Sequence, residues 1–108
     1  MNNLEQARNI NPKFKDYYIL KNWYLSGKKW FQPCRPDETI VLCGEAYEHA
    51  FYITTSLIQE VVTKEEHKEI RTLNSIYWIY PEEVNKEYIA QYPDCYELLK
   101  EGKWDWNV

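Results

Sequence analysis

Most side chains that could do chemistry in this sequence are short polar groups, and they lie on two segments rich in β-branched and aromatic residues. The segments, residues 51–62 and 70–80, flank the charged run TKEEHKE, a layout that predicts a long antiparallel hairpin. If Val62 faces Ile70, hydroxyl, amide and guanidinium groups from both strands lie at similar depth. Groups of this kind orient small molecules in pockets, so we predict a ligand-binding surface at Thr54, Ser56, Arg71, Thr72, Asn74, Ser75 and Tyr77.

The same polar groups also have a purely structural interpretation. Hydroxyls of strand Thr and Ser residues often bond only to the neighbouring backbone. The five donors of the Arg71 guanidinium and the amide of Asn74 are harder to satisfy inside a small sheet, which favours a site. Residues 71 and 74 point to opposite faces of a regular strand, so both can serve one site only if a bulge lies between them. Both interpretations stay open.

Nucleophiles and metal ligands are sparse. The sequence has no GxSxG or HExxH motif, and its three Gly residues are too few for a phosphate-binding loop. We expect His67, in the charged turn, to lie in solvent. His49, Cys34 and Cys43 match no recurrent zinc spacing. The charge of Arg35 can lower the pKa of the neighbouring Cys34, but no base stands at a readable spacing, so an ordinary loop cysteine is preferred. We therefore predict no catalytic residue, no metal site and no cofactor.

The length and the aromatic content bound the organisation of the chain. Its 108 residues predict a single domain, 1–108, because a second domain would be too small to bury its own core. Ten Tyr, five Trp and three Phe are more rings than such a domain can bury. Either the core is rich in aromatic residues with some rings at the surface, or some rings form a partner interface or stack on a planar ligand. The surplus also predicts a homo-oligomer, most simply a two-fold dimer.

Charge and hydropathy argue against several classes of partner. The formal net charge is −4 and the 13 basic residues are scattered, so we expect no binding to nucleic acid. No stretch approaches 18 apolar residues, and the start MNNLEQARNINPK lacks the core of a signal peptide, so we expect no membrane association and a cytoplasmic location. Three Cys residues without a CxxC pair fit free thiols in a reducing cytosol.

The hydrophobic pattern predicts an α+β fold. We expect a small bent antiparallel sheet, or a partial barrel, of about five strands with one or two short C-terminal helices. Residues 1–15 are polar and predict a loosely ordered arm, residues 16–80 a β-rich core, residues 81–102 a helical segment and residues 103–108 a tail.

Two sheet elements precede the long hairpin. The strand 17–25 is followed by a tight turn at Gly27 and by a short return strand that begins at residues 30–31. In the next element, residues 39–47, Gly44 and Ala46 fall on one face, which indicates that another backbone passes close to them.

The C-terminal segment changes period at Pro81. Pro93 suits the first turn of a second helix, and Gly102 suits its C-cap. Trp104 and Trp106 lie on one side of the tail if the chain is extended there. The tail therefore predicts either a last edge strand or an anchor onto a neighbouring subunit.

The hairpin segments also carry a resemblance to other proteins. A Gly-then-His link, a TTSxI strand and a TxNSxY strand resemble a group of small proteins of bacteria, phages and prophages for which no activity is established. Within roughly residues 40–99 the matching positions are Gly44, His49, Thr54, Thr55, Ser56, Ile58, Thr72, Asn74, Ser75 and Tyr77. This sequence lacks the Pro and Gly that follow the His in that group, and its TKEEHKE turn is longer. The resemblance implies a compact β-rich fold in a mobile-element setting, and nothing catalytic.

These features predict a small non-enzymatic binding protein. In the setting that the resemblance implies, it would act in the host cytosol as an anti-defence factor that inhibits a host immune protein or sequesters a small signalling ligand. The alternative is a structural or accessory subunit of a larger assembly that docks through Trp104 and Trp106. An enzyme is the third and least supported class.

Overall fold

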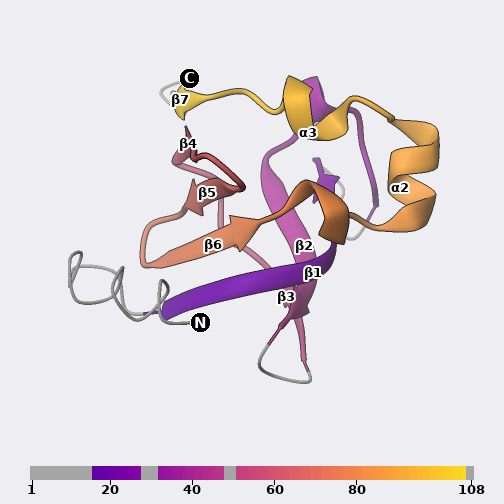
Figure 1. Cartoon of the computed structure of the whole chain (residues 1–108). Helices are drawn as coiled ribbons and strands as arrows, with labels where there is room; N and C mark the ends of the chain where they lie inside the picture. Colours follow the sequence, from indigo (N-terminus) through magenta and orange to yellow (C-terminus); the bar gives the residue numbers. More distant parts are fainter. Residues whose placement is uncertain (1–15, 28–31, 48–50, 107–108) are drawn as a thin grey trace.

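The computed structural model describes residues 16–27, 32–47 and 51–106, and this part of the chain is built on one mixed sheet (Figure 1). Its seven strands are β1 (Asp16–Ser26), β2 (Val41–Ala46), β3 (Tyr52–Thr54), β4 (Glu60–Thr63), β5 (Lys68–Arg71), β6 (Ser75–Ile79) and β7 (Gly102–Lys103). Their order across the sheet is β3-β2-β1-β6-β5-β4-β7. β1 and β6 run parallel, whereas every other neighbouring pair is antiparallel.

The predicted fold class is confirmed in its coarser form. The described chain is mostly β with two short helices, α2 (Lys86–Gln91) and α3 (Cys95–Leu98), and two 3₁₀ turns, η1 (Pro36–Glu38) and η2 (Pro81–Glu83). The sheet has more strands than the predicted five, and it is mixed rather than antiparallel. The parallel pair joins strands that are far apart in the sequence, and the alternation of residues within one strand carries no information about such a partner.

The predicted long hairpin of residues 51–62 and 70–80 is wrong. Residues 51–62 contain two strands in different parts of the sheet, because β3 pairs with β2 whereas β4 pairs with β5 and β7. Residues 70–80 turn back on themselves, and there the backbone N–H of Thr72 donates to the carbonyl of Ser75 at 3.0 Å. The turn contains Asn74, a residue type that turns favour. The residue that faces Ile70 is Val61 rather than Val62.

A bulge interrupts β1, the longest strand. Its register with β2 shifts between Lys21 and Tyr24. Asn22, within the shift, has a φ of 54°, in the left-handed region that Asn tolerates better than most side chains do. A Cβ added to Gly44 would lie 3.2 Å from the carbonyl oxygen of Lys21, so the predicted close approach of a second backbone is confirmed. The return strand predicted at residues 30–31 falls outside the described residues.

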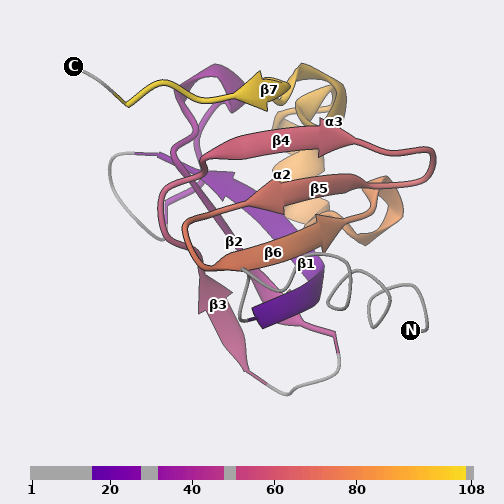
Figure 2. The same ribbon diagram turned by 90° about the vertical axis from the view of Figure 1, so that its left-hand side faces the viewer.

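The helices cover one face of the sheet (Figure 2). Asn85 caps α2, since its side-chain oxygen accepts a hydrogen bond from the backbone N–H of Tyr88 at 2.9 Å. Tyr88, Cys95 and Leu99 then pack with strand residues such as Ile70 in the main core. A smaller cluster on the other face consists of buried Tyr17, Ile76 and Trp78.

Two C-terminal details differ from their predictions. α3 begins at Cys95, so Pro93 precedes the helix instead of lying in its first turn. Gly102 is not a helix C-cap, because α3 ends at Leu98. Gly102 lies in β7 with a φ of 88° and pairs with Val61. The tail therefore leaves the sheet from a two-residue edge strand beside β4.

Candidate functional site

The seven predicted ligand-binding residues do not form one site. Thr54 lies on β3 and Tyr77 on β6, with β2 and β1 between them in the sheet. Neighbouring strands lie about 4.8 Å apart, so about 14 Å of sheet separates these two residues. Ser56 is exposed in the segment that connects β3 to β4. The other four, Arg71, Thr72, Asn74 and Ser75, lie at or beside the β5–β6 turn.

One of the polar side chains at this turn, that of Thr72, closes the turn itself. The hydroxyl of Thr72 donates to the carbonyl oxygen of Ser75 at 3.2 Å, beside the backbone hydrogen bond between the same residues. Tyr77 is buried, and its ring stacks on that of Tyr18 with 5.7 Å between centroids. Asn74 is exposed. Of the predicted group, Arg71 and Thr72 line a surface hollow that is described below.

Arg71 is held by two carboxylates. Its guanidinium donates to Glu69 at 2.7 Å and to Glu60 at 3.1 Å. The other carboxylate oxygen of Glu69 accepts a hydrogen bond from Nε1 of Trp78 at 3.0 Å. Glu69 is only 5% exposed, so this buried carboxylate is satisfied from two sides. The sequence interpretation missed Glu69, because a Glu within TKEEHKE looks like any solvated charge.

His67 lies against the same residues, so the prediction that it is solvated is wrong. Its ring centroid is 4.3 Å from that of Trp78 and 5.1 Å from that of Tyr80. Its Nε2 atom is buried and has no hydrogen-bond partner within the described ranges. Burial lowers the pKa of His67, while the charges of Glu69 and Lys64 shift that pKa in opposite directions. The imidazole is therefore neutral at pH 7.

Two hollows open beside the C-terminal tail, and Trp104 lines both of them. The Arg71 hollow, of about 340 Å³, lies at the β5–β6 turn and includes Arg71, Thr72, Leu73, Lys103 and Trp104. The acidic hollow, of about 390 Å³, lies between the tail and η1 and includes Asp37, Glu38, Lys100, Trp104, Asp105 and Trp106. Residues from three distant parts of the sequence thus meet around one indole ring.

The two tail tryptophans are fixed by their own chain. Nε1 of Trp104 donates to the carbonyl of Lys100 at 2.9 Å, and Nε1 of Trp106 donates to that of Ile58 at 2.7 Å. The backbone N–H of Trp104 donates to the carbonyl of Gln59 at 2.8 Å. The two ring centroids are 6.1 Å apart with the planes inclined by 45°, and both residues are half-buried. Because the indole N–H groups are already bonded, the exposed parts of the rings are apolar faces and edges.

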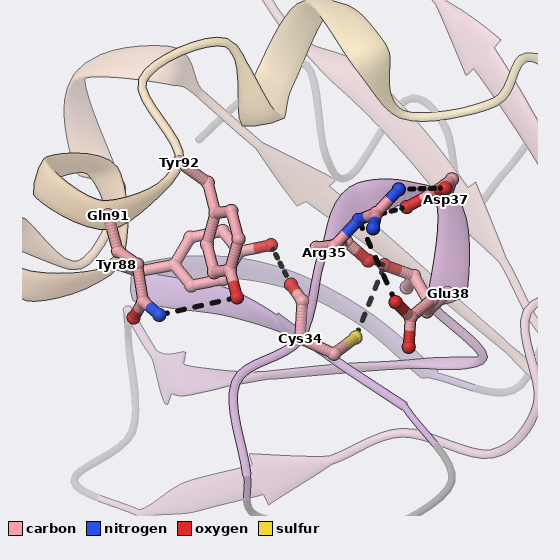
Figure 3. Close-up of polar contacts among 8 residues, drawn as sticks. Cys34, Arg35, Asp37, Glu38, Tyr88, Gln91 and Tyr92 are labelled. Atoms are coloured by element: carbon pink, nitrogen blue, oxygen red, sulfur yellow. Dashed lines mark hydrogen bonds and ion pairs between the residues drawn. The ribbon is translucent and has the colours of Figure 1, made fainter.

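The η1 turn forms another wall of the acidic hollow. Figure 3 shows Arg35 turned toward Asp37 and Glu38. Its guanidinium donates to the two carboxylate oxygens of Asp37 at 3.2 and 2.8 Å and lies 3.7 Å from Glu38. The hydroxyl of Tyr88, from α2, donates to the carbonyl of Cys34 at 2.7 Å (Figure 3). The helix therefore holds the segment that presents these carboxylates.

The Cys34 thiol is not activated by the neighbouring Arg35. Burial raises the pKa of Cys34, and the charges of Glu38 and Asp37 act in the same direction. Arg35 cannot oppose this shift effectively, because Asp37 pairs with it. Burial likewise raises the pKa of Cys95 to about 11. Neither thiol is a nucleophile suited to neutral pH.

A third hollow, of about 450 Å³, lies at the β1 bulge. The side-chain amides of Asn22 and Asn85, which line this hollow, are already hydrogen-bonded within the chain. Asn85 donates to Asn22 at 2.9 Å, and Asn22 donates to Glu45 at 2.9 Å. The remaining polar atom of the Asn85 side chain caps α2. Within the described chain, no aromatic ring lines this hollow. The tail hollows are therefore the stronger candidates for recognition.

No group of three or more His, Cys, Asp and Glu side chains in the described residues is arranged to hold a metal ion. His49 lies outside those residues. None of the described helices has the length and apolar character needed to cross a membrane.

Comparison of the chain with protein-family models, curated proteins and solved structures finds no match. Its function is therefore inferred from the geometry of the chain itself.

Proposed function

We propose that this protein is a non-enzymatic binding protein and that it binds its partner through the tail face, which we define as the Arg71 hollow, the acidic hollow and the two tryptophans that line them. The observation that carries the proposal is Trp104, a half-buried ring that lines both hollows. Protein interfaces concentrate their binding energy in such aromatic anchors at the centre of a polar rim.

The surroundings of Trp104 have this arrangement. Gln59, Glu60 and Arg71 surround it on one side, and Glu38 and Lys100 on the other. The indole rings are already fixed by hydrogen bonds to the chain, so little rotational freedom is lost when a partner covers them. A preorganised aromatic centre with charges of both signs at its edge favours specific protein binding.

A segment of a partner protein suits this face better than one compact ligand. A small molecule would fill one hollow and leave the shared ring partly uncovered, whereas a chain that crosses Trp104 contacts both hollows. The resemblance of the segments 51–62 and 70–80 to phage and prophage proteins favours a host protein as the partner, with inhibition of an immune component as the working hypothesis. A second copy of this chain and a larger assembly are the competing partners, and the predicted homo-oligomer stays a prediction.

Photo-crosslinking in the source cytosol tests the proposal. A photoreactive phenylalanine is placed at Leu98, in the acidic hollow, or at Leu73, in the Arg71 hollow; these side chains are 63% and 73% exposed. Both positions should capture the same partner, and Trp104→Ala should reduce both yields. The control position is Tyr47, which is 53% exposed beyond the far end of β2. Equal capture from position 47, or no capture from either hollow, would refute the proposal.

A further inference from the structure

We propose that the β4–β5 turn, residues 64–67, is an acid-sensitive latch. When His67 takes up a proton, its ring leaves Trp78 and Tyr80, and the turn opens while the rest of the sheet stays folded. The inference does not depend on the proposed function. The turn follows the pair Thr63–Lys68, whereas the Arg71 hollow lies at the opposite ends of β4 and β5 (Figure 2).

His67 holds the turn closed with its side chain and with its backbone. The ring centroid lies 4.3 Å from that of Trp78 with the planes inclined by 32°, and 5.1 Å from that of Tyr80 with the planes inclined by 38°. The backbone carbonyl of His67 accepts a hydrogen bond from the N–H of Lys64 at 2.8 Å. Trp78 belongs to the smaller core cluster, so an open turn would uncover the edge of that cluster.

The buried nitrogen of this ring is what makes the contact sensitive to acid. Nε2 of His67 has no hydrogen-bond partner in the described part of the chain. In the charged ring both nitrogens are donors, so the closed turn would bury an N–H group and a positive charge without an acceptor. The nearby carboxylate of Glu69 does not supply one, because its two oxygens accept hydrogen bonds from Trp78 and Arg71.

The charges around the ring do not reverse this preference. Burial lowers the pKa of His67 and is the largest effect; Glu69 and Glu66 raise that pKa, and Lys64 lowers it. A proton therefore binds more tightly to the open turn than to the closed turn, and by linkage its uptake favours opening. The charged and titratable groups near the ring in the described residues are Lys64 and Glu66 from the turn, Glu69 from β5, and Tyr80 from β6, on which Glu82 of η2 acts electrostatically.

The size of the effect follows from the two pKa values of His67. In the open turn the ring has its ordinary pKa of about 6.5, so the equilibrium constant for opening rises as the pH falls below this value. It levels off below the pKa of the closed turn. Between pH 7.5 and 5.5 we expect this constant to rise about threefold to tenfold, a factor that the pKa measured in the folded protein sets.

NMR of the ¹⁵N-labelled protein tests the latch. The ring signal of His67, assigned by its loss in His67→Gln, should titrate below pH 6.5. Exchange of the Lys64 amide with water reports opening, and exchange of the Thr55 amide, which donates to the carbonyl of Leu42 at 2.9 Å, reports unfolding of the sheet. From pH 7.5 to 5.5 the protection of Lys64, corrected for the intrinsic exchange rate, should fall about threefold to tenfold. The protection of Thr55 should not change.

Two variants separate the proton from the packing. His67→Phe keeps a ring against Trp78 and Tyr80 but cannot take up a proton, so the protection of Lys64 should be the same at both pH values. The matched control is Glu65→Gln, an exposed carboxylate of the same turn, which should keep the full fall.

Three results would overturn the inference. A His67 pKa at or above 6.5 would mean that the attraction of the two rings and of Glu69 keeps the charged imidazole in place. A parallel loss of protection at Lys64 and Thr55 would mean that the sheet unfolds as a whole, without a latch. A fall of the same size in His67→Phe would assign the pH dependence to another group.

Discussion

Replacing Glu69 is the sharpest test of how the sheet is held together. This carboxylate is nearly completely buried and accepts hydrogen bonds from Nε1 of Trp78 at 3.0 Å and from Arg71 at 2.7 Å. Glu69→Ala leaves the indole N–H without an acceptor in a dry site, and it leaves Arg71 with Glu60 alone. Both effects lower the free energy of unfolding.

The magnitude follows from the exposure of each partner. A hydrogen bond to a charged group contributes about 1.5–3 kcal/mol, and the buried bond from Trp78 belongs in that range. Arg71 is 27% exposed and keeps its 3.1 Å contact with Glu60, so water screens its loss to less than about 1 kcal/mol. We expect Glu69→Ala to lower the free energy of unfolding by about 3 kcal/mol, and Glu69→Gln, which keeps an acceptor oxygen, by about 1 kcal/mol.

Urea denaturation of single and double variants measures these quantities. A double-mutant cycle of Glu69→Ala with Trp78→Phe should give a coupling energy of about 1–2 kcal/mol. The control is Glu65→Ala, an exposed carboxylate in the turn between β4 and β5, which should change the free energy of unfolding by less than about 0.5 kcal/mol. The reasoning fails if both Ala variants cost the same, or if the coupling energy is below about 0.3 kcal/mol.

Three further predictions concern the ring of His67, the close backbone approach at Gly44 and the helix cap at Asn85. Burial lowers the pKa of folded His67 below its ordinary value of 6.5, so the unfolded chain takes up the proton first. Neutral His67 therefore contributes fully to the free energy of unfolding above about pH 6.5, and this contribution is lost as the pH falls. The urea midpoints at pH 7.5 and 5.5 should differ less in His67→Gln than in the wild type. An equal difference in the two proteins would contradict this. Gly44→Ala, whose Cβ would lie 3.2 Å from the carbonyl oxygen of Lys21, should lower the free energy of unfolding by about 1–3 kcal/mol, and a neutral result would mean that β1 shifts freely. Asn85→Ala should cost about 1 kcal/mol in the same assay, because the backbone N–H of Tyr88 loses its cap, whereas Asn85→Asp should keep most of it; equal losses would exclude capping as the cause.

Elements that depend on nearby residues can be predicted from the sequence alone. The pattern of residues 39–47 predicts β2, and the change of period after Pro81 predicts one or two short helices, of which the described chain has two. Apolar residues on both faces of the segment 70–80 predict a strand that is central in a sheet or part of a small barrel. In the structure β6 lies between β1 and β5, with Tyr77 and Ile79 in one core cluster and Ile76 in the other. Such signals are local, because the period of a segment follows from its own backbone geometry.

Which segments contact one another depends on the packing of the whole chain. The sequence pattern predicts one strand over β3 and β4, but β3 pairs with β2 and β4 pairs with β5, because pairing follows from burial of the whole core rather than from the pattern of one segment. Glu69 has the same side chain as exposed Glu65, and Trp78 on the neighbouring strand is what makes it an interior hydrogen-bond acceptor. The acidic hollow likewise joins η1 to Trp104 and Trp106, near the other end of the chain. A contact between distant segments leaves no periodic signal in either of them, so the sequence could indicate Trp104 and Trp106 but not the residues of η1 and of the β5–β6 turn that lie beside them.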